Sequence, residues 1–169
     1  MRYDVGTVPR TVRLNKEMRK RKRIHLIDFD YTGSGYLYFI TICTFNKNPY
    51  FKNYEIAKVP EEEFKFRISK NEVFIYCYCI MPDHFHVLLS FTDEYNKSLQ
   101  VWISSFKRFT SKIVKERFNL NKLWQGNFYE HIVRTDESFS NIAEYILNNP
   151  VRKRIVKHWQ EYELSKLLV

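Results

Sequence analysis

The chain has 169 residues, and 28 Lys and Arg against 19 Asp and Glu give it a formal net charge of +9. This length suits one domain with terminal segments, and the basic surplus makes a polyanion such as nucleic acid the first partner to consider. The three cysteines and the lack of a signal-peptide pattern argue against a disulfide-rich secreted protein, and no apolar run approaches the roughly 20 residues of a membrane span. We therefore expect a cytoplasmic protein that does not enter a membrane.

The first segment, residues 1–23, is basic and has little apolar content. It cannot bury enough apolar surface to order itself, so we expect a flexible arm before a single domain over residues 24–169. The arm could lie along a phosphate backbone, or it could simply be solvated. Its densest charges are Arg19, Lys20, Arg21, Lys22 and Arg23.

Four stretches have the composition of β-strands. Residues 36–45 are β-branched and aromatic almost throughout, as expected of a strand inside a sheet. Residues 73–80 and 84–91 are two further apolar runs, and the three residues between them form a turn. Residues 128–134 form the fourth predicted strand.

Helical spacing marks the remaining stretches. A short helix is expected from Pro60, because proline is favoured at the first helical position and three glutamates follow it. A longer helix begins after an N-cap, Ser98, and its apolar residues recur three or four positions apart. Another helix is predicted over residues 137–149, and the tail, residues 151–169, is expected to be a basic and then amphipathic helix.

This order of elements predicts the fold. Strand, helix, strand, strand, helix, strand is the βαββαβ order of the ferredoxin-like α+β fold, in which two helices cover one face of a four-stranded antiparallel sheet. The strand over residues 84–91 would be central, and the opposite face would be free for a site. The helix over residues 137–149 comes after the fold is complete, so it is available to cover that face.

Further cations lie on the helix after Ser98 and at the start of the tail. They are compatible with a solvated surface or with a surface that follows a DNA backbone. Our candidate phosphate contacts in these segments are Lys107, Arg108, Lys112, Arg152, Lys153 and Arg154.

His84 and His86 are separated by one residue and follow a Pro-Asp turn signal. Because side chains alternate along a strand, the two histidines share one face, while Phe85 and Val87 pack on the other. Two neutral imidazoles so placed can converge on one metal ion, although such a pair can also be a partly buried structural feature.

Tyr145 and Asn149 are four residues apart on the helix over residues 137–149, so they lie on the same side of it. If this helix crosses the histidine face, it brings a hydroxyl and an amide oxygen to the two imidazoles. That set could hold Mg²⁺ or Mn²⁺ beside a tyrosine nucleophile that attacks a phosphodiester. The alternative is that Tyr145 is an aromatic residue half packed on the core.

Five motifs occur in a fixed order, at residues 38–44, 81–86, 106–107, 124–134 and 145–150. Together they resemble the REP-associated tyrosine transposases, which belong to the HUH single-tyrosine transposases of bacterial insertion sequences. The similarity covers most of the chain, from about Arg21 to Val156. Arg134 matches the family pattern, and we count it among the candidate DNA contacts.

The resemblance implies a mechanism. In this family two histidines and a polar residue one turn after the tyrosine bind the metal, and the tyrosine cuts single-stranded DNA, keeps a 5′-phosphotyrosine and frees a 3′-hydroxyl. It thus implies that His84, His86 and Asn149 are ligands and that Tyr145 is the nucleophile. It also implies a transposase that depends on Mg²⁺ or Mn²⁺ and acts on single-stranded or hairpin DNA. Such an enzyme would work as a monomer or homodimer in the bacterial cytoplasm, on the nucleoid when bound to DNA.

Three features depart from the family pattern. Asp83 replaces the asparagine that is common before the first histidine, and it adds a negative charge near the ion. The segment between the first two strands is short, so we expect its helix to be reduced. Tyr129 is a second tyrosine within a motif, for which packing or base stacking is expected because it lies on a strand.

Two other functions are considered. The first is a noncatalytic nucleic-acid-binding module of ferredoxin-like fold, which would bind DNA without Tyr145 or metal. The second is a structural zinc site made by Cys77, Cys79, His84 and His86, although Cys-x-Cys spacing within a strand is poor for zinc.

Overall fold

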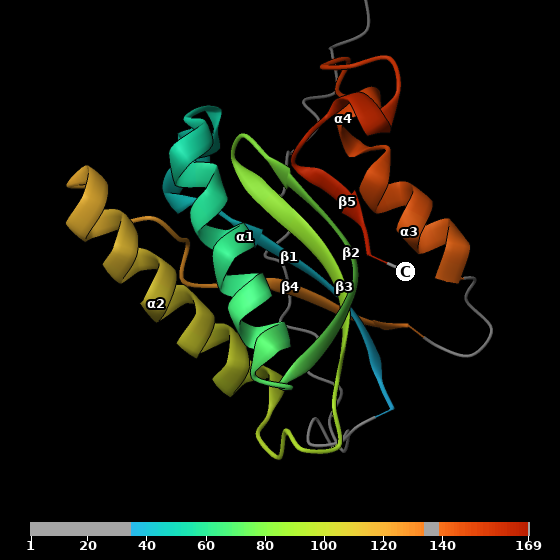
Figure 1. Cartoon of the computed structure of the whole chain (residues 1–169). Helices are drawn as coiled ribbons and strands as arrows, with labels where there is room; N and C mark the ends of the chain where they lie inside the picture. Colours follow the sequence, from blue (N-terminus) through green and yellow to red (C-terminus); the bar gives the residue numbers. More distant parts are fainter. Residues whose placement is uncertain (1–34, 134–138, 169) are drawn as a thin grey trace, which may run out of the picture.

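The computed structural model describes residues 35–133 and 139–168. Its strands form one antiparallel sheet in the order β4, β1, β3, β2, β5, as Figure 1 shows. The strands are β1 (Leu37–Cys43), β2 (Val73–Met81), β3 (His84–Phe91), β4 (Tyr129–Val133) and β5 (Ser165–Leu167). The first four have the ferredoxin-like order, which confirms the predicted fold class and the central position of the histidine strand β3.

Two helices cover one face of the sheet (Figure 1), as predicted. They are α1 (Tyr54–Ser69) and α2 (Leu99–Phe118), and α2 begins at the predicted N-cap, where the Ser98 hydroxyl accepts from the Val101 amide at 3.4 Å. The main core lies between these helices and the inward side of the strands. Its centre is aromatic: the Phe64 and Phe106 rings stack with centroids 5.1 Å apart, and Phe85 meets both.

The prediction of a reduced first helix starting at Pro60 was wrong. The helix is 16 residues long and begins after Asn53, whose side chain accepts a hydrogen bond from the Glu55 amide at 3.0 Å. Pro60 lies inside it and is buried, so packing compensates for the backbone hydrogen bond that proline cannot donate. The prediction of a start at Pro60 did not take into account that Asn53, seven residues earlier, can cap a helix.

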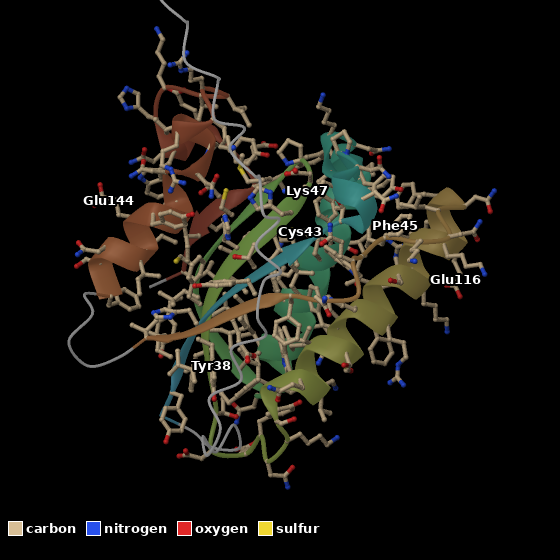
Figure 2. The ribbon with its side chains drawn as sticks, turned by 180° about the vertical axis from the view of Figure 1, so that it is seen from behind. Tyr38, Cys43, Phe45, Lys47, Glu116 and Glu144 are labelled. Atoms are coloured by element: carbon tan, nitrogen blue, oxygen red, sulfur yellow. The ribbon has the colours of Figure 1, made fainter. Side chains whose placement is uncertain are left out.

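Helix α3 (Phe139–Leu147) packs against β2 and β3 on the other face, as predicted for the added helix. A second apolar cluster lies beneath it, formed by Cys77, Cys79, Met81, Leu88, Ala143, Ile146 and Leu147. The sheet therefore has helices on both faces, and in Figure 2 Glu116 on α2 and Glu144 on α3 lie on opposite sides of the molecule. The start of the predicted helix, residues 137 and 138, lies outside the described residues.

The prediction of a helical tail was also wrong. After the short helix α4 (Asn149–Arg152), the chain turns at Arg154, where φ is 57°, and passes through the 3₁₀ turn η3 (Trp159–Glu161) into β5. Strand β5 pairs with part of β2, so it covers backbone groups that would otherwise be exposed at the sheet edge. No helix in the described part of the chain is long and apolar enough to cross a membrane.

Candidate functional site

His84 and His86 lie side by side on the face of β3 that α3 approaches. Their ring centroids are 4.8 Å apart, and His86 is buried, with 6% of its surface exposed. Phe85 and Val87 point into the main core, so the predicted alternation of β3 is confirmed. The turn before β3 supplies no apolar cover for His84, which remains partly exposed.

Each histidine is oriented by a hydrogen bond to its Nδ1 atom. His84 Nδ1 lies 2.6 Å from Asp83 Oδ1, and His86 Nδ1 lies 2.7 Å from the Thr41 hydroxyl, which the register of β1 and β3 places directly opposite. With a proton on each Nδ1, both Nε2 lone pairs are free to bind an ion. Metal-binding histidines in proteins are typically oriented in this way, by a carboxylate or another acceptor.

Neither orienting residue was identified as such from the sequence. Asp83 was noted only as an added charge, and Thr41 only as part of a strand motif. The Asp83 contact is between sequence neighbours and could have been expected. The Thr41 contact depends on the pairing of two strands 45 residues apart, which periodicity within either strand does not reveal.

The electrostatics keep His86 neutral. Burial is the main cause that lowers its pKa to about 3, and the nearby His84 and Arg152 lower it further. Only the neutral imidazole has a lone pair to donate to a metal ion, so the site holds His86 in the form that a ligand requires.

Helix α3 brings Tyr145 to the histidine pair. The Tyr145 ring centroid lies 5.8 Å from that of His86 and 5.8 Å from that of Phe39, and the side chain remains 44% exposed. The Arg152 guanidinium carbon also lies over this ring, 4.0 Å from its centroid. The tyrosine is therefore held among two rings and a cation while it stays open to a substrate.

The helix predicted over residues 137–149 is interrupted just before Asn149. The helix that carries Tyr145 ends at Leu147, and Asn149 is the first residue of α4, where it is buried with 2% of its surface exposed. Its side chain forms no hydrogen bond with either histidine among the residues that the structure describes. Its role as third ligand stays a prediction.

The binding of Mg²⁺ or Mn²⁺ at the histidine pair stays a prediction. Two neutral imidazoles leave most of the coordination sphere open for oxygen ligands, which Mg²⁺ and Mn²⁺ prefer. Within residues 35–133 and 139–168, no group of three or more His, Cys, Asp or Glu side chains is arranged to hold a metal ion. The remaining ligands would be an amide oxygen, such as that of Asn149, and oxygens of the substrate.

The structure does not support the alternative zinc site. Cys79 pairs with His86 across the two strands, but both Cys77 and Cys79 are fully buried in the apolar cluster under α3. Burial raises the pKa of each thiol to about 12, which opposes the thiolate that zinc requires. An irregularity in the register of β2 between Ile75 and Cys77 turns these thiols toward α3.

The predicted DNA contacts fall into separate groups. Lys107, Arg108 and Lys112 lie on α2, across the sheet from the histidines. The Lys107 ammonium donates to the carbonyl oxygens of residues 125, 126 and 127 at 2.8 to 3.2 Å, so it supports a loop. Arg108 and Lys112 are exposed or partly so, Lys112 with Glu116 3.9 Å away.

The remaining cations are at the tail or outside the described residues. Arg152, Lys153 and Arg154 are exposed at and after the end of α4, and Arg152 is the one in contact with Tyr145. The candidate contacts outside the described residues are Arg19, Lys20, Arg21, Lys22, Arg23 and Arg134.

The sequence is similar to a family of transposases and to individual transposases of two bacteria. The family described as "Transposase IS200 like" matches residues 33–149. A putative REP-associated tyrosine transposase of Haemophilus influenzae is 31% identical over 145 residues, which cover 77% of this chain and 80% of that protein. The REP-associated tyrosine transposase of Escherichia coli K12 is 25% identical over 91 residues, 54% of this chain and 52% of that one.

A solved structure has the same fold. It is that of a REP-associated tyrosine transposase bound to a REP hairpin, and it superposes with a TM-score of 0.62. The match covers 81% of this chain and 79% of that one, at 22% sequence identity. The sheet and helices described above therefore have the fold of that transposase.

Proposed function

Because the chain belongs to the IS200-like transposases, and among them to the REP-associated tyrosine transposases, we propose that it cleaves and rejoins single-stranded or hairpin DNA through a covalent bond to Tyr145. The observation that carries this proposal is the position of Tyr145. An exposed tyrosine ring lies 5.8 Å from the ring of His86, which stands beside His84.

The cleavage step balances without a free water molecule. The Tyr145 oxygen attacks the phosphorus of a phosphodiester, and the bond from phosphorus to the 3′ oxygen breaks. The phenol gives up one proton and the leaving 3′ oxygen takes one up, so the step has no net change in protons. The products are a 5′-phosphotyrosine and a strand with a free 3′-hydroxyl. In the reverse direction a 3′-hydroxyl attacks the phosphotyrosine, which restores a phosphodiester and releases the tyrosine.

The residues around Tyr145 prepare it for this step. Phe39 and His86 contact the edges of the ring, and the Arg152 guanidinium lies over it. Orientation of a nucleophile in this way is a large part of what an enzyme contributes. A divalent cation held by His84, His86 and Asn149 would neutralise charge on the phosphate oxygens.

A covalent adduct is the decisive measurement. The protein is incubated with labelled single-stranded DNA that carries a hairpin, with Mn²⁺ or with EDTA, and the products are separated on a denaturing gel. We expect a labelled protein band with Mn²⁺ that is absent with EDTA and absent for Tyr145→Phe. Tyr54→Phe is the matched control, because Tyr54 is 40% exposed and lies on α1.

Two outcomes would contradict the proposal. An adduct that persists in Tyr145→Phe would show that another residue is the nucleophile. DNA binding without any adduct, on a broad pool of hairpin substrates and with either metal, would favour the noncatalytic binding module.

Size-exclusion chromatography of the complex would distinguish the monomer from the homodimer.

A further inference from the structure

An exposed ring stands on the sheet beside the proposed nucleophile. Tyr129 begins β4, and 52% of its surface is exposed, more than that of Tyr145. In the register of β1 and β4 it lies opposite Thr41, so it is on the face of the sheet that carries His86. An exposed aromatic ring on this face is not explained by core packing.

A row of aromatic rings joins Tyr129 to the site. The Tyr129 ring meets that of Phe39 edge-on, with centroids 6.0 Å apart. Phe39 in turn lies 5.5 Å from the ring of His86 and 5.8 Å from that of Tyr145. The row leads from an edge strand directly to the group that would attack the phosphate.

Among the described residues, the helix on this face covers only part of the sheet. Helix α3 packs mainly over β2 and β3, and the buried cluster beneath it is built from those strands. Figure 2 shows β4 and β1 in front of the rest of the sheet, with α3 to one side. Tyr129, on β4, is 52% exposed, and the main contacts of α3 are with β2 and β3.

The chemistry of this surface selects its ligand. Aromatic side chains beside cations bind single-stranded nucleic acid, because every unpaired base has a face that can stack and the cation attracts the adjoining phosphate. Arg152, in contact with Tyr145, supplies a cation at the inner end of the row. A base in a duplex is stacked on its neighbours, so this surface favours an unpaired one.

We propose that Tyr129, supported by Phe39, is the stacking platform for an unpaired base next to the phosphate that Tyr145 attacks. This inference rests on the proposed function, since the position of the phosphate is that of the nucleophile. The platform holds the DNA strand so that the phosphate beyond the stacked base reaches Tyr145. Stacking does not distinguish strongly among bases, so it contributes affinity and position more than sequence preference.

The test measures stacking and binding in protein that cannot cleave. In a Tyr145→Phe background, 2-aminopurine is placed in turn at each position of the unpaired strand flanking a hairpin, and its fluorescence and binding anisotropy are recorded. We expect quenching at one flanking position and its loss in Tyr129→Ala. The affinity for the flanked hairpin should fall about tenfold, while affinity for the hairpin without flanks is unchanged.

Two variants isolate the ring. Tyr129→Phe keeps the stacking surface and should retain both quenching and affinity. Phe66→Ala removes a ring that is 51% exposed on α1, across the sheet, and should have no effect. Equal quenching and affinity in Tyr129→Ala and its parent would overturn the platform, as would an equal loss on DNA without flanks.

Cleavage by protein with an intact Tyr145 is scored separately. If an adduct forms but Tyr129→Ala binds normally, the platform fails and the proposed reaction stands. If Tyr129→Ala loses stacking while no adduct ever forms, the proposed reaction fails, and Tyr129 is then a base-stacking site without an attacked phosphate beside it.

Discussion

The Arg152 guanidinium carbon lies 4.0 Å from the centre of the Tyr145 ring, and Arg152 Nη1 donates to the Tyr145 carbonyl oxygen at 3.5 Å. The two residues are on different helices, because α3 ends at Leu147 and α4 begins at Asn149. Arg152 on α4 thus contacts the ring of the proposed nucleophile on α3. Its remaining donors face solvent, where a phosphate could accept them.

Removal of this contact should slow adduct formation more than it weakens DNA binding. Arg152→Ala frees the Tyr145 ring and removes a charge near the phosphate, so we expect the single-turnover rate to fall about 10- to 100-fold. Arg152→Lys keeps the charge but loses the planar contact, and it should be intermediate. The measurement is adduct yield against time at saturating DNA.

Lys153→Ala is the control for charge, since Lys153 is the exposed neighbour of Arg152. It should bind DNA slightly less well and react at the normal rate once bound. If both alanine variants lower affinity equally and neither changes the rate at saturation, Arg152 is only one phosphate contact among several.

The parts of the site that the sequence predicted are those set by local periodicity. His84 and His86 share a face because strands alternate, and Tyr145 reaches them because the apolar side of its helix, with Ile146 buried, turns it toward the sheet. The five sequence motifs then indicated the family. These inferences needed only neighbours within one element.

Features that depend on distant segments were missed. Thr41 meets His86 through strand pairing, and β5 forms a strand because the open edge of β2 accepts it. Lys107 was predicted to face a phosphate, but a loop 18 to 20 residues away gives its ammonium three carbonyl partners. In each case the structural role of the residue or segment depends on a contact with a distant part of the chain, which composition does not reveal.

Asp83 should control metal affinity through His84. Asp83→Ala removes the acceptor for His84 Nδ1, and we expect Mn²⁺ binding, measured by calorimetry, to weaken about 10- to 100-fold. Asp83→Asn keeps an acceptor without the charge, so its effect should be smaller. Thr41→Val removes the corresponding partner of His86 and should also weaken binding.

Asp93→Asn is the matched control for the loss of one carboxylate, because Asp93 lies in the loop after β3. Its Mn²⁺ affinity should equal that of the unmodified protein. Equal affinities for Asp83→Ala and Asp93→Asn would show that the Asp83 contact does not act on a metal ligand.

His86 should make stability depend on pH in metal-free protein. Its pKa is about 3 in the fold and about 6.5 in an unfolded chain, so below pH 6.5 the unfolded state takes up a proton that the folded state refuses. The stabilisation is complete above about pH 6.5 and is lost as the pH falls toward 3, by up to about 1.4 kcal/mol per pH unit.

Urea unfolding in EDTA at several pH values between 4.5 and 7.5 measures this slope. His86→Gln should lose the contribution, so its free energy of unfolding should fall less steeply with acid than that of the parent. His158→Gln changes an exposed histidine and should keep the parent slope. Identical slopes for all three proteins would mean that His86 is readily protonated in the fold.

The stability of the scaffold should depend on one buried arginine. Arg67, 3% exposed, donates to Glu63 at 2.8 Å, to Glu72 at 3.0 Å and to Ser105 at 3.0 Å, and so joins α1, α2 and the segment that leads into β2. Arg67→Met fills similar space but leaves the buried Glu63 carboxylate without its partner. We expect it to lower the free energy of unfolding by about 3 to 5 kcal/mol, measured in urea.

A second substitution separates the cost of the unpaired charge from the loss of packing. Glu63→Leu added to Arg67→Met removes the isolated carboxylate, and because a buried ion pair often stabilises no more than an apolar pair, much of the lost stability should return. Lys65→Met is the surface control: its ion pair with Glu61 at 3.2 Å involves an exposed ammonium and should contribute about 0.5 kcal/mol or less. If the double variant is as unstable as Arg67→Met, the loss comes from the contacts of Arg67 with Glu72, with Ser105 and with the Trp102 ring, 5.1 Å from its guanidinium carbon.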